Sequence, residues 1–267
     1  MDNAGSGKQT RTAAQIVGLI LLGIAAGFLS GMFGVGGGII IVPGLMAIAG
    51  FSQRLASGTS LATIVPLASV GVISYASHGS VSWIGALLLA LGAIAGAQLG
   101  TWLLVRISRK PLQIFFALFM VAAIVSLFMV VPSRDATLTI DWPVGIGLVA
   151  LGFVTGTLSG LLGVGGGIVV VPALMLFFGV SDLIAKGTSL LVMIPTALTG
   201  TVSNFKRKNV DLAAAAIVGL PACATTYLGS LAASAAPPEI ANIFFAIFLA
   251  FVAAQLLWKA LRAPKTN

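Results

Sequence analysis

The sequence predicts an all-α integral membrane protein, on the strength of its composition, its long apolar runs and an internal repeat. Hydrophobic residues make up 58% of the 267 residues and charged residues only 7%. A soluble domain carries about 25% charged residues, because its surface must be wetted. The apolar runs are rich in Leu, Ile, Val, Ala and Gly and lack the strict polar alternation of a transmembrane β-barrel. A multi-pass helical bundle is therefore expected.

Ten apolar segments can be marked, where a helix needs about 20 residues to cross a bilayer. The second and seventh are short, follow a glycine cluster and contain a proline. The expected segments are 13–33, 37–50, 57–77, 82–104, 111–131, 143–162, 166–179, 187–204, 210–233 and 239–260. They divide the chain into an N-terminal tail (1–12), a first membrane repeat (13–131), an outer linker (132–142), a second repeat (143–260) and a C-terminal tail (261–267).

The basic residues predict the orientation. If all ten segments cross and the N-terminus is cytoplasmic, the cytoplasmic side receives 12 of the 14 Lys and Arg residues. Only Arg134 and Lys186 then face outward, which agrees with the positive-inside rule. If the two short segments did not cross, Arg106, Arg109 and Lys110 would face outward, so ten crossings fit better. We expect a protein of the cytoplasmic membrane with both termini cytoplasmic.

A tandem duplication accounts for nearly the whole chain. At a shift of 129 residues, Gly27–Tyr75 aligns with Gly156–Asn204 without a gap, and 25 of the 49 pairs are identical. Each repeat contains five segments, an odd number, so the two copies are expected to be inserted upside down relative to each other. Inverted repeats with short, interrupted helices at matching positions are typical of secondary transporters, whose binding sites lie near the midplane. The alternative is a duplication of a purely structural bundle.

A glycine cluster stands at the start of each short segment. Four glycines in five residues will break a helix, and backbone N–H groups freed inside a membrane can hold an anion at the start of the next helix. The alternative is a plain connecting turn or a close helix contact. The candidate substrate-binding glycines are Gly34, Gly36, Gly37 and Gly38, with their copies Gly163, Gly165, Gly166 and Gly167.

A Gly-Thr-Ser-Leu motif follows each glycine cluster, at 58–61 and at 187–190. Hydroxyl groups and free N–H groups can bind an oxyanion without a charged side chain, whereas the alternative role is helix capping or back-bonding within the helix. The candidate substrate-binding hydroxyls are Thr59, Ser60, Thr188 and Ser189. Prolines inside the neighbouring segments predict helix kinks at Pro43, Pro66, Pro172 and Pro195.

Other polar and small residues have more modest predicted roles. Glycines at a spacing of four, as in Gly23, Gly27 and Gly31, predict close helix packing and not ligand binding, and could also support a homodimer. Lys186 could attract anions or lie at the membrane interface. Polar residues within the segments are candidates to line a cavity, although an interhelical hydrogen bond is the alternative for each: Tyr75, Gln98, Asn204 and Tyr227.

Several classes of function are excluded or disfavoured. A single cysteine, Cys223, allows no intramolecular disulfide, and one histidine with six acidic residues makes a metal site or a catalytic triad hard to assemble. We therefore expect no enzyme activity, no metal and no cofactor. The net charge of +8 comes from basic residues at segment ends, so membrane lipid and not nucleic acid is the expected partner.

The doubled pattern GFLSGMFGVGGG and GTLSGLLGVGGG, each with a proline and GTSL downstream, resembles the TauE/SafE family of sulfite exporters, also called the toluenesulfonate uptake permease family. The resemblance covers about residues 14–260. It implies transport of sulfite or organosulfonates such as sulfoacetate across the cytoplasmic membrane. It also implies that the glycine clusters and the paired Thr and Ser residues are the positions to examine.

The resulting interpretation is a secondary transporter that exports a small sulfur oxyanion, bound at the midplane by helix N-termini and hydroxyls. An anion or small-solute channel and a non-transport membrane subunit are the alternatives. All six acidic residues and His78 fall in tails, loops or segment ends on this map, and nothing basic lies securely inside a segment. The sequence therefore predicts that helix dipoles offset the charge of the anion and that no titrating side chain is essential.

Overall fold

The computed structural model describes residues 11–103, 117–125, 136, 138–162 and 166–262. Within these residues the chain is helical, and residues 117–125 form part of the fifth predicted segment. The helices are α1 (Ala13–Phe33), α2 (Gly38–Ala49), α3 (Gln53–Ser77), α4 (Trp83–Leu103), α6 (Trp142–Leu162), α7 (Gly167–Phe178), α8 (Asp182–Lys206), α9 (Leu212–Ala235) and α10 (Pro238–Arg262). The prediction of an all-α membrane protein is confirmed.

Five of these helices are long and apolar enough to cross a membrane: α1, α3, the first 18 residues of α6, α8 and α9. The described parts of α2, α4, α7 and α10 are apolar but shorter. At a rise of about 1.5 Å per residue, the 12-residue helices α2 and α7 reach only part of the way across a bilayer. They are the short helices that the sequence predicted, and the number of complete crossings stays a prediction.

Two helices begin earlier than predicted, and serine caps are the reason. The structure starts α3 at Gln53 and α8 at Asp182, where the apolar runs begin at 57 and 187. Ser52 Oγ accepts a hydrogen bond from the N–H of Leu55, and Ser181 Oγ accepts one from Ile184. Such a bond satisfies one of the free N–H groups of a first turn. The extra turn brings Asp182 and Lys186 into α8.

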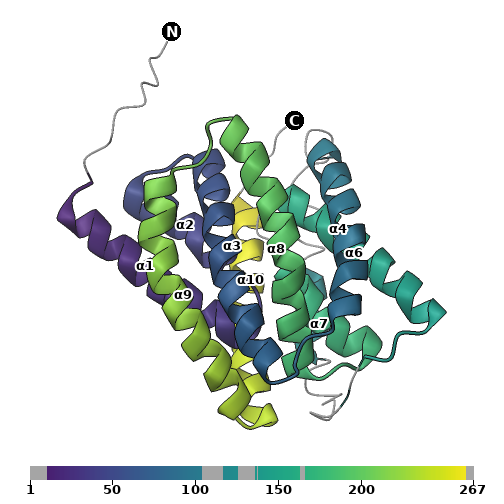
Figure 1. Cartoon of the computed structure of the whole chain (residues 1–267). Helices are drawn as coiled ribbons and strands as arrows, with labels where there is room; N and C mark the ends of the chain where they lie inside the picture. The colour runs from purple at the N-terminus through teal and green to yellow at the C-terminus, as the bar shows by residue number, and fades with distance from the viewer. Residues whose placement is uncertain (1–10, 104–116, 126–135, 137, 163–165, 263–267) are drawn as a thin grey trace.

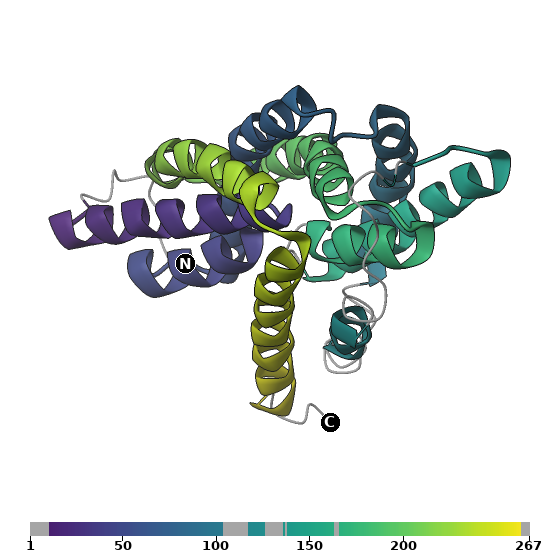
Figure 2. The same cartoon turned by 90° about the horizontal axis from the view of Figure 1, so that it is seen from below.

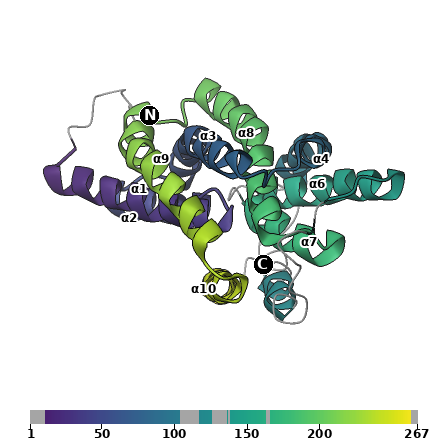
Figure 3. The same cartoon turned by 60° about the horizontal axis from the view of Figure 1, so that its bottom comes forward.

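The helices form three groups, as Figure 1 and Figure 3 show. The central pair, α3 and α8, lies between a group made of α1, α2 and α9 and a group made of α4, α6 and α7. Figure 2 shows α10 and the helical residues 117–125 on one side of the layer that the remaining helices form. The ring of Phe33, at the end of α1, stacks on Phe245 and Phe248 of α10 with centroid distances of 5.5 and 5.0 Å. This contact ties α10 to the centre of the molecule.

Glycines bring helices from different repeats into backbone contact. A Cβ built on Gly23, Gly27 or Gly31 of α1 would overlap the carbonyl oxygen of Val218, Ala222 or Thr226 of α9. Glycines 92 and 96 of α4 meet the carbonyls of residues 149 and 153 of α6 in the same way. In both pairs the residue numbers rise together, so the helices run parallel. The prediction that these glycines form packing faces is confirmed.

The central helices run antiparallel and show that the repeats are inverted. Going along α3, Gly58 lies against Asn204, Gly71 against Leu190 and Tyr75 against Gly187, so the numbers on α8 fall as those on α3 rise. Helices α3 and α8 are each other's copies at the shift of 129 residues. Two equivalent helices that pack antiparallel are related by a two-fold axis perpendicular to them. The predicted inverted arrangement follows from this packing.

Candidate functional site

The first glycine cluster forms a buried turn between α1 and α2. Gly34, Gly36 and Gly37 have φ angles of 69°, 75° and 67°, in the left-handed region that favours glycine. The turn ends α1, where the Gly34 N–H donates to Ser30 O at 2.8 Å, and it begins α2, for which Gly37 is the N-cap. The sequence predicted a helix break here, and the break is confirmed.

Backbone donors in this turn are left free. Among the described residues, the N–H groups of Val35, Gly36, Gly37 and Gly38 donate to no backbone or side-chain oxygen. All four residues are buried. A buried N–H without a partner costs about as much as a lost hydrogen bond, and native structures pair nearly all such groups. Four neighbouring N–H groups at the start of α2 are therefore available to an acceptor.

The start of α7 meets this turn from the opposite repeat. A Cβ built on Gly167 would lie 3.0 Å from Gly34 O and 2.9 Å from Met193 Sδ. The same methionine faces Gly36, where a built Cβ would lie 2.6 Å from Met193 Sδ. The N-terminal ends of the two short helices thus converge on one side chain of α8. Gly163 and Gly165 of the second cluster lie outside the described residues.

The two threonines of the GTSL motifs hold the starts of neighbouring helices. The N–H of Asp211, the N-cap of α9, donates to Thr59 Oγ1 at 3.0 Å. The N–H of Ser82, just before α4, donates to Thr188 Oγ1 at 3.0 Å. The two contacts are copies of each other at the shift of 129 residues. Of the two roles left open for the threonines, these bonds favour capping.

The two serines of the motifs differ from each other. Ser189 Oγ donates to Gly34 O at 2.9 Å and so fixes the glycine turn to α8. Its copy, Ser60, is 2% exposed, and its Oγ has no hydrogen-bond partner. Ser60 lies one turn before Ile64, whose Cγ2 is 3.8 Å from a Cβ built on Gly36. Ser30 Oγ, one turn before Gly34, is also buried without a partner.

The four predicted cavity-lining residues separate into inner and outer positions. Tyr75 is 1% exposed, and its hydroxyl donates to Gly31 O at 2.6 Å, so it satisfies a carbonyl in the last turn of α1. Asn204 is half-buried and donates to Gly200 O within its own helix. Gln98 is exposed, and Tyr227 is 49% exposed on α9. The exposure of Tyr227 does not decide between a cavity and the outer surface of α9, so its role as a cavity-lining residue stays a prediction. The four prolines predicted to cause kinks all lie inside helices, Pro43 in α2, Pro66 in α3, Pro172 in α7 and Pro195 in α8.

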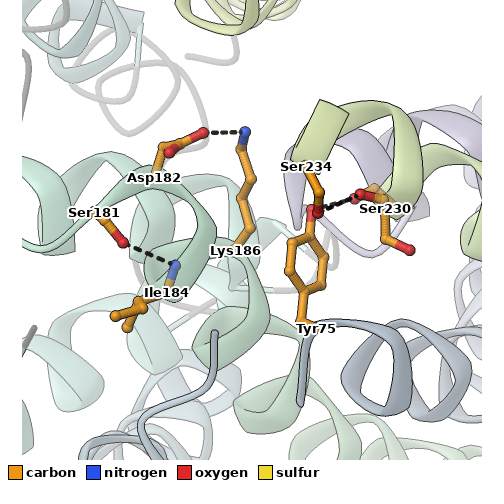
Figure 4. Close-up of polar contacts among 8 residues, drawn as sticks. Tyr75, Ser181, Asp182, Ile184, Lys186, Ser230 and Ser234 are labelled. Atoms are coloured by element: carbon orange, nitrogen blue, oxygen red, sulfur yellow. Dashed lines mark hydrogen bonds and ion pairs between the residues drawn. The ribbon is translucent and has the colours of Figure 1, made fainter. Parts of the chain in front are cut away.

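A buried ion pair stands beside the glycine turn, contrary to the expectation that nothing basic lies inside a segment. Lys186 Nζ lies 2.9 Å from Asp182 Oδ2, and the two side chains are 2% and 8% exposed (Figure 4). Both belong to the first two turns of α8. The sequence map was wrong because it began this segment at Gly187. The spacing of four residues was the signal for a pair on one helix face.

A second ion pair joins the N-terminal segment to α9. Arg11 Nη2 lies 2.6 Å from Asp211 Oδ2, and Asp211 Oδ1 accepts the N–H of Ala214. Partial burial raises the pKa of the Asp211 carboxyl, but the backbone N–H bonds and the Arg11 guanidinium outweigh it. The pKa of Asp211 therefore lies below its ordinary value. The residue that caps α9 is held as a carboxylate and also bonds to Thr59 through its N–H.

These observations define a class: a multi-pass helical membrane protein made of two inverted repeats, with a buried, donor-rich turn where two short helices meet. Among the described residues, no group of three or more His, Cys, Asp or Glu side chains could hold a metal ion. The chain belongs to the Sulfite exporter TauE/SafE family, whose pattern matches residues 3–127 and 148–267. The family resemblance seen in the glycine and GTSL motifs is thereby confirmed.

Curated relatives agree on the class of activity. The chain is 28% identical over 217 residues to "Probable membrane transporter protein YunE" of Bacillus subtilis, covering 72% of this chain and 79% of that protein. It is 30% identical over 260 residues to a "Probable membrane transporter protein" of Xylella fastidiosa, covering 93% and 97%. A relative from Haemophilus influenzae, 28% identical over 262 residues, carries the same description. These names describe membrane transporters and not enzymes.

Proposed function

We propose that the chain is a secondary transporter that exports small sulfur oxyanions, such as sulfite or organosulfonates, across the cytoplasmic membrane. The observation that carries the proposal is the set of four buried, unpaired N–H groups at the start of α2. An oxyanion offers several acceptor atoms to such a cradle, and the N-terminal ends of α2 and α7 add about half a positive charge each. The sulfur chemistry of the substrate is suggested by the family alone.

The buried hydroxyls beside the turn complete the proposed site. The Oγ atoms of Ser60 and Ser30 are buried and have no hydrogen-bond partner. An anion in the turn would give these donors an acceptor. Ser189 would act by fixing the turn, and the glycines of both clusters would supply backbone donors and close approach. Thr59 and Thr188 would hold the neighbouring helix starts in register.

The proposal is tested by flux and binding measurements on purified protein. Proteoliposomes should take up sulfite or sulfoacetate with saturation, and sulfate serves as a comparison oxyanion. Ser60→Ala and Ser189→Ala should weaken binding by about 1–2 kcal/mol per lost hydrogen bond, or about five- to thirtyfold. Thr59→Ala and Thr188→Ala, the matched variants one residue earlier, should lower the melting temperature more than the affinity.

The result also decides between the proposal and its rivals. Flux that rises without saturation through the wild-type protein would favour an anion channel. Absence of flux for every anion would favour a non-transport membrane subunit. If Thr59→Ala weakens binding as much as Ser60→Ala with no loss of stability, the threonines belong to the site and the assignment to capping is wrong.

We further propose that all ten segments cross and that both termini are cytoplasmic, as the distribution of basic residues indicates. Single cysteines in a Cys223→Ser background report the side of each loop. A cysteine in place of His78, in the turn after α3, should react with an impermeant maleimide added to intact cells. A cysteine in place of Arg207, in the turn after α8, should react only after the membrane is opened. Labelling of both residues from outside would contradict this topology.

A further inference from the structure

The buried ion pair of α8 breaks the symmetry of the two repeats. At the shift of 129 residues, Lys186 corresponds to Ser57 and Asp182 to Gln53. Gln53 is exposed and Ser57 is half-buried, whereas Lys186 and Asp182 are 2% and 6% exposed. The fold is therefore built once without these charges and once with them. The inverted-repeat fold as such therefore does not demand the pair, and a role beyond that fold can be sought for it.

The position of Lys186 places its side chain beside the donor-rich turn. A Cβ built on Gly34 would lie 2.6 Å from Lys186 Cα and 2.8 Å from Lys186 Cβ. Ser189, nearly one turn further along the same face, bonds to Gly34 O. The lysine side chain thus starts from the edge of the turn, while its ammonium is directed back along α8 to Asp182 (Figure 4).

A buried ion pair of this kind is not held by a large net gain in free energy, so an exchange of partners is open to it. Two charges taken out of water lose hydration, and their mutual attraction repays this loss only in part, so a buried ion pair is a weak source of stability. Helix N-termini alone carry partial charges, whereas the lysine supplies a full one. An incoming anion can replace the carboxylate as the partner of the ammonium. The carboxylate left behind favours the return of the lysine once the anion has gone.

We propose that Lys186 is the counter-charge for the transported oxyanion and that Asp182 holds its ammonium while the site is empty. This inference rests on the proposed function and names the charged residue of that same site. Asp182 then acts as a built-in competitor that keeps binding weak enough for release. Because the first repeat lacks the pair, only α8 supplies a charged side chain to the proposed site, and α3 supplies none at the matching position.

The test compares anion binding in four variants of the full chain in detergent, with sulfite and methanesulfonate as probes. Asp182→Asn removes the competitor and should bind the anion at least about tenfold more tightly. Lys186→Gln removes the counter-charge and should bind at least about tenfold more weakly. The double variant should bind as weakly as Lys186→Gln. Ser57→Ala, at the matching position of α3, should behave as the wild type.

The shift in melting temperature on adding anion distinguishes a role in binding from a purely structural role. Anion addition should raise the melting temperature of Asp182→Asn more than that of the wild type and should leave Lys186→Gln unchanged, because only the state that binds is stabilised. The double variant leaves no buried charge unpaired, so it remains measurable if a single variant fails to fold. If that double variant binds as the wild type does, the pair has no part in recognition and the inference is overturned.

The two proposals fail in different ways. Wild-type protein that binds and transports the anion, together with an unchanged affinity in every variant, contradicts the role of Lys186 alone. Equal weakening by both single variants, with recovery in the double variant, assigns the pair to stability and also contradicts the inference. Wild-type protein that binds neither probe and shows no flux contradicts the proposed function itself, and the role of Lys186 falls with it.

Discussion

Gly31→Ala should break the contact between α1 and α9 and lower the free energy of unfolding by at least about 3 kcal/mol, at the upper end of measured overpacking costs. A Cβ at this position would overlap Thr226 O and lie 2.9 Å from Ser230 N, so the obstacle is backbone that cannot rotate away. The two helices would have to separate along their whole contact. After heating in detergent, size-exclusion chromatography should show most of the variant aggregated at temperatures where the wild type stays monodisperse.

Gly219→Ala is the matched control for this prediction, because it changes a glycine of α9 whose built Cβ has its nearest neighbour, Thr63 Cγ2, at 3.7 Å. That distance is ordinary van der Waals contact, and alanine favours a helix over glycine by about 1 kcal/mol. This variant should be as stable as the wild type or slightly more so. A Gly31→Ala protein that melts like Gly219→Ala would show that α1 and α9 are not held in backbone contact.

Gly36→Ala should reduce anion binding by at least about tenfold and bring flux close to background, while the protein still folds. The left-handed backbone at φ 75° costs a residue with a Cβ about 1–2 kcal/mol, and the new methyl group would also lie 2.6 Å from Met193 Sδ. A turn that relaxes away from this conformation no longer aims its N–H groups at one place. Affinity from calorimetry and the melting temperature, measured on the same sample, separate the two effects.

Gly50→Ala controls for backbone strain alone, since Gly50 has a φ of 67° and a Cβ there would meet nothing within 4 Å. It should lose a similar amount of stability and keep its affinity. A second variant, Gly36→Ala combined with Met193→Ala, removes the collision but not the strain. If this double variant binds the anion normally, the turn needs room and not its backbone conformation, and the N–H groups are not the ligands.

Much of the fold follows from the sequence because lipid imposes a simple rule on helices. Long apolar runs predict α1 with its observed bounds, and the duplication with its odd number of segments predicts the inverted arrangement that α3 and α8 display. The starts of α3 and α8 were missed because an apolar run does not include the polar first turn that a serine cap creates. Ser52 and Ser181, at matching positions, were the available signal.

The site was only partly predictable, because spacing says which residues are near in the chain and not what they bond to. The glycine turn between α1 and α2 and its free donors agree with the pattern of Gly34–Gly38. The roles of the threonines required the partners Asp211 and Ser82, which are distant in sequence. The burial of Lys186 depends on how the end of α1 packs against α8, which no local pattern encodes.

The glycine faces also bear on the origin of the chain by duplication. Helix α1 comes from the first repeat and is in backbone contact with α9 of the second, while α4 of the first repeat is in the same contact with α6 of the second. Each tightly joined unit is thus a hybrid of the two repeats, so neither repeat is complete without the other. A single ancestral repeat would have found the partner for its glycine face only in a second copy inserted in the opposite direction.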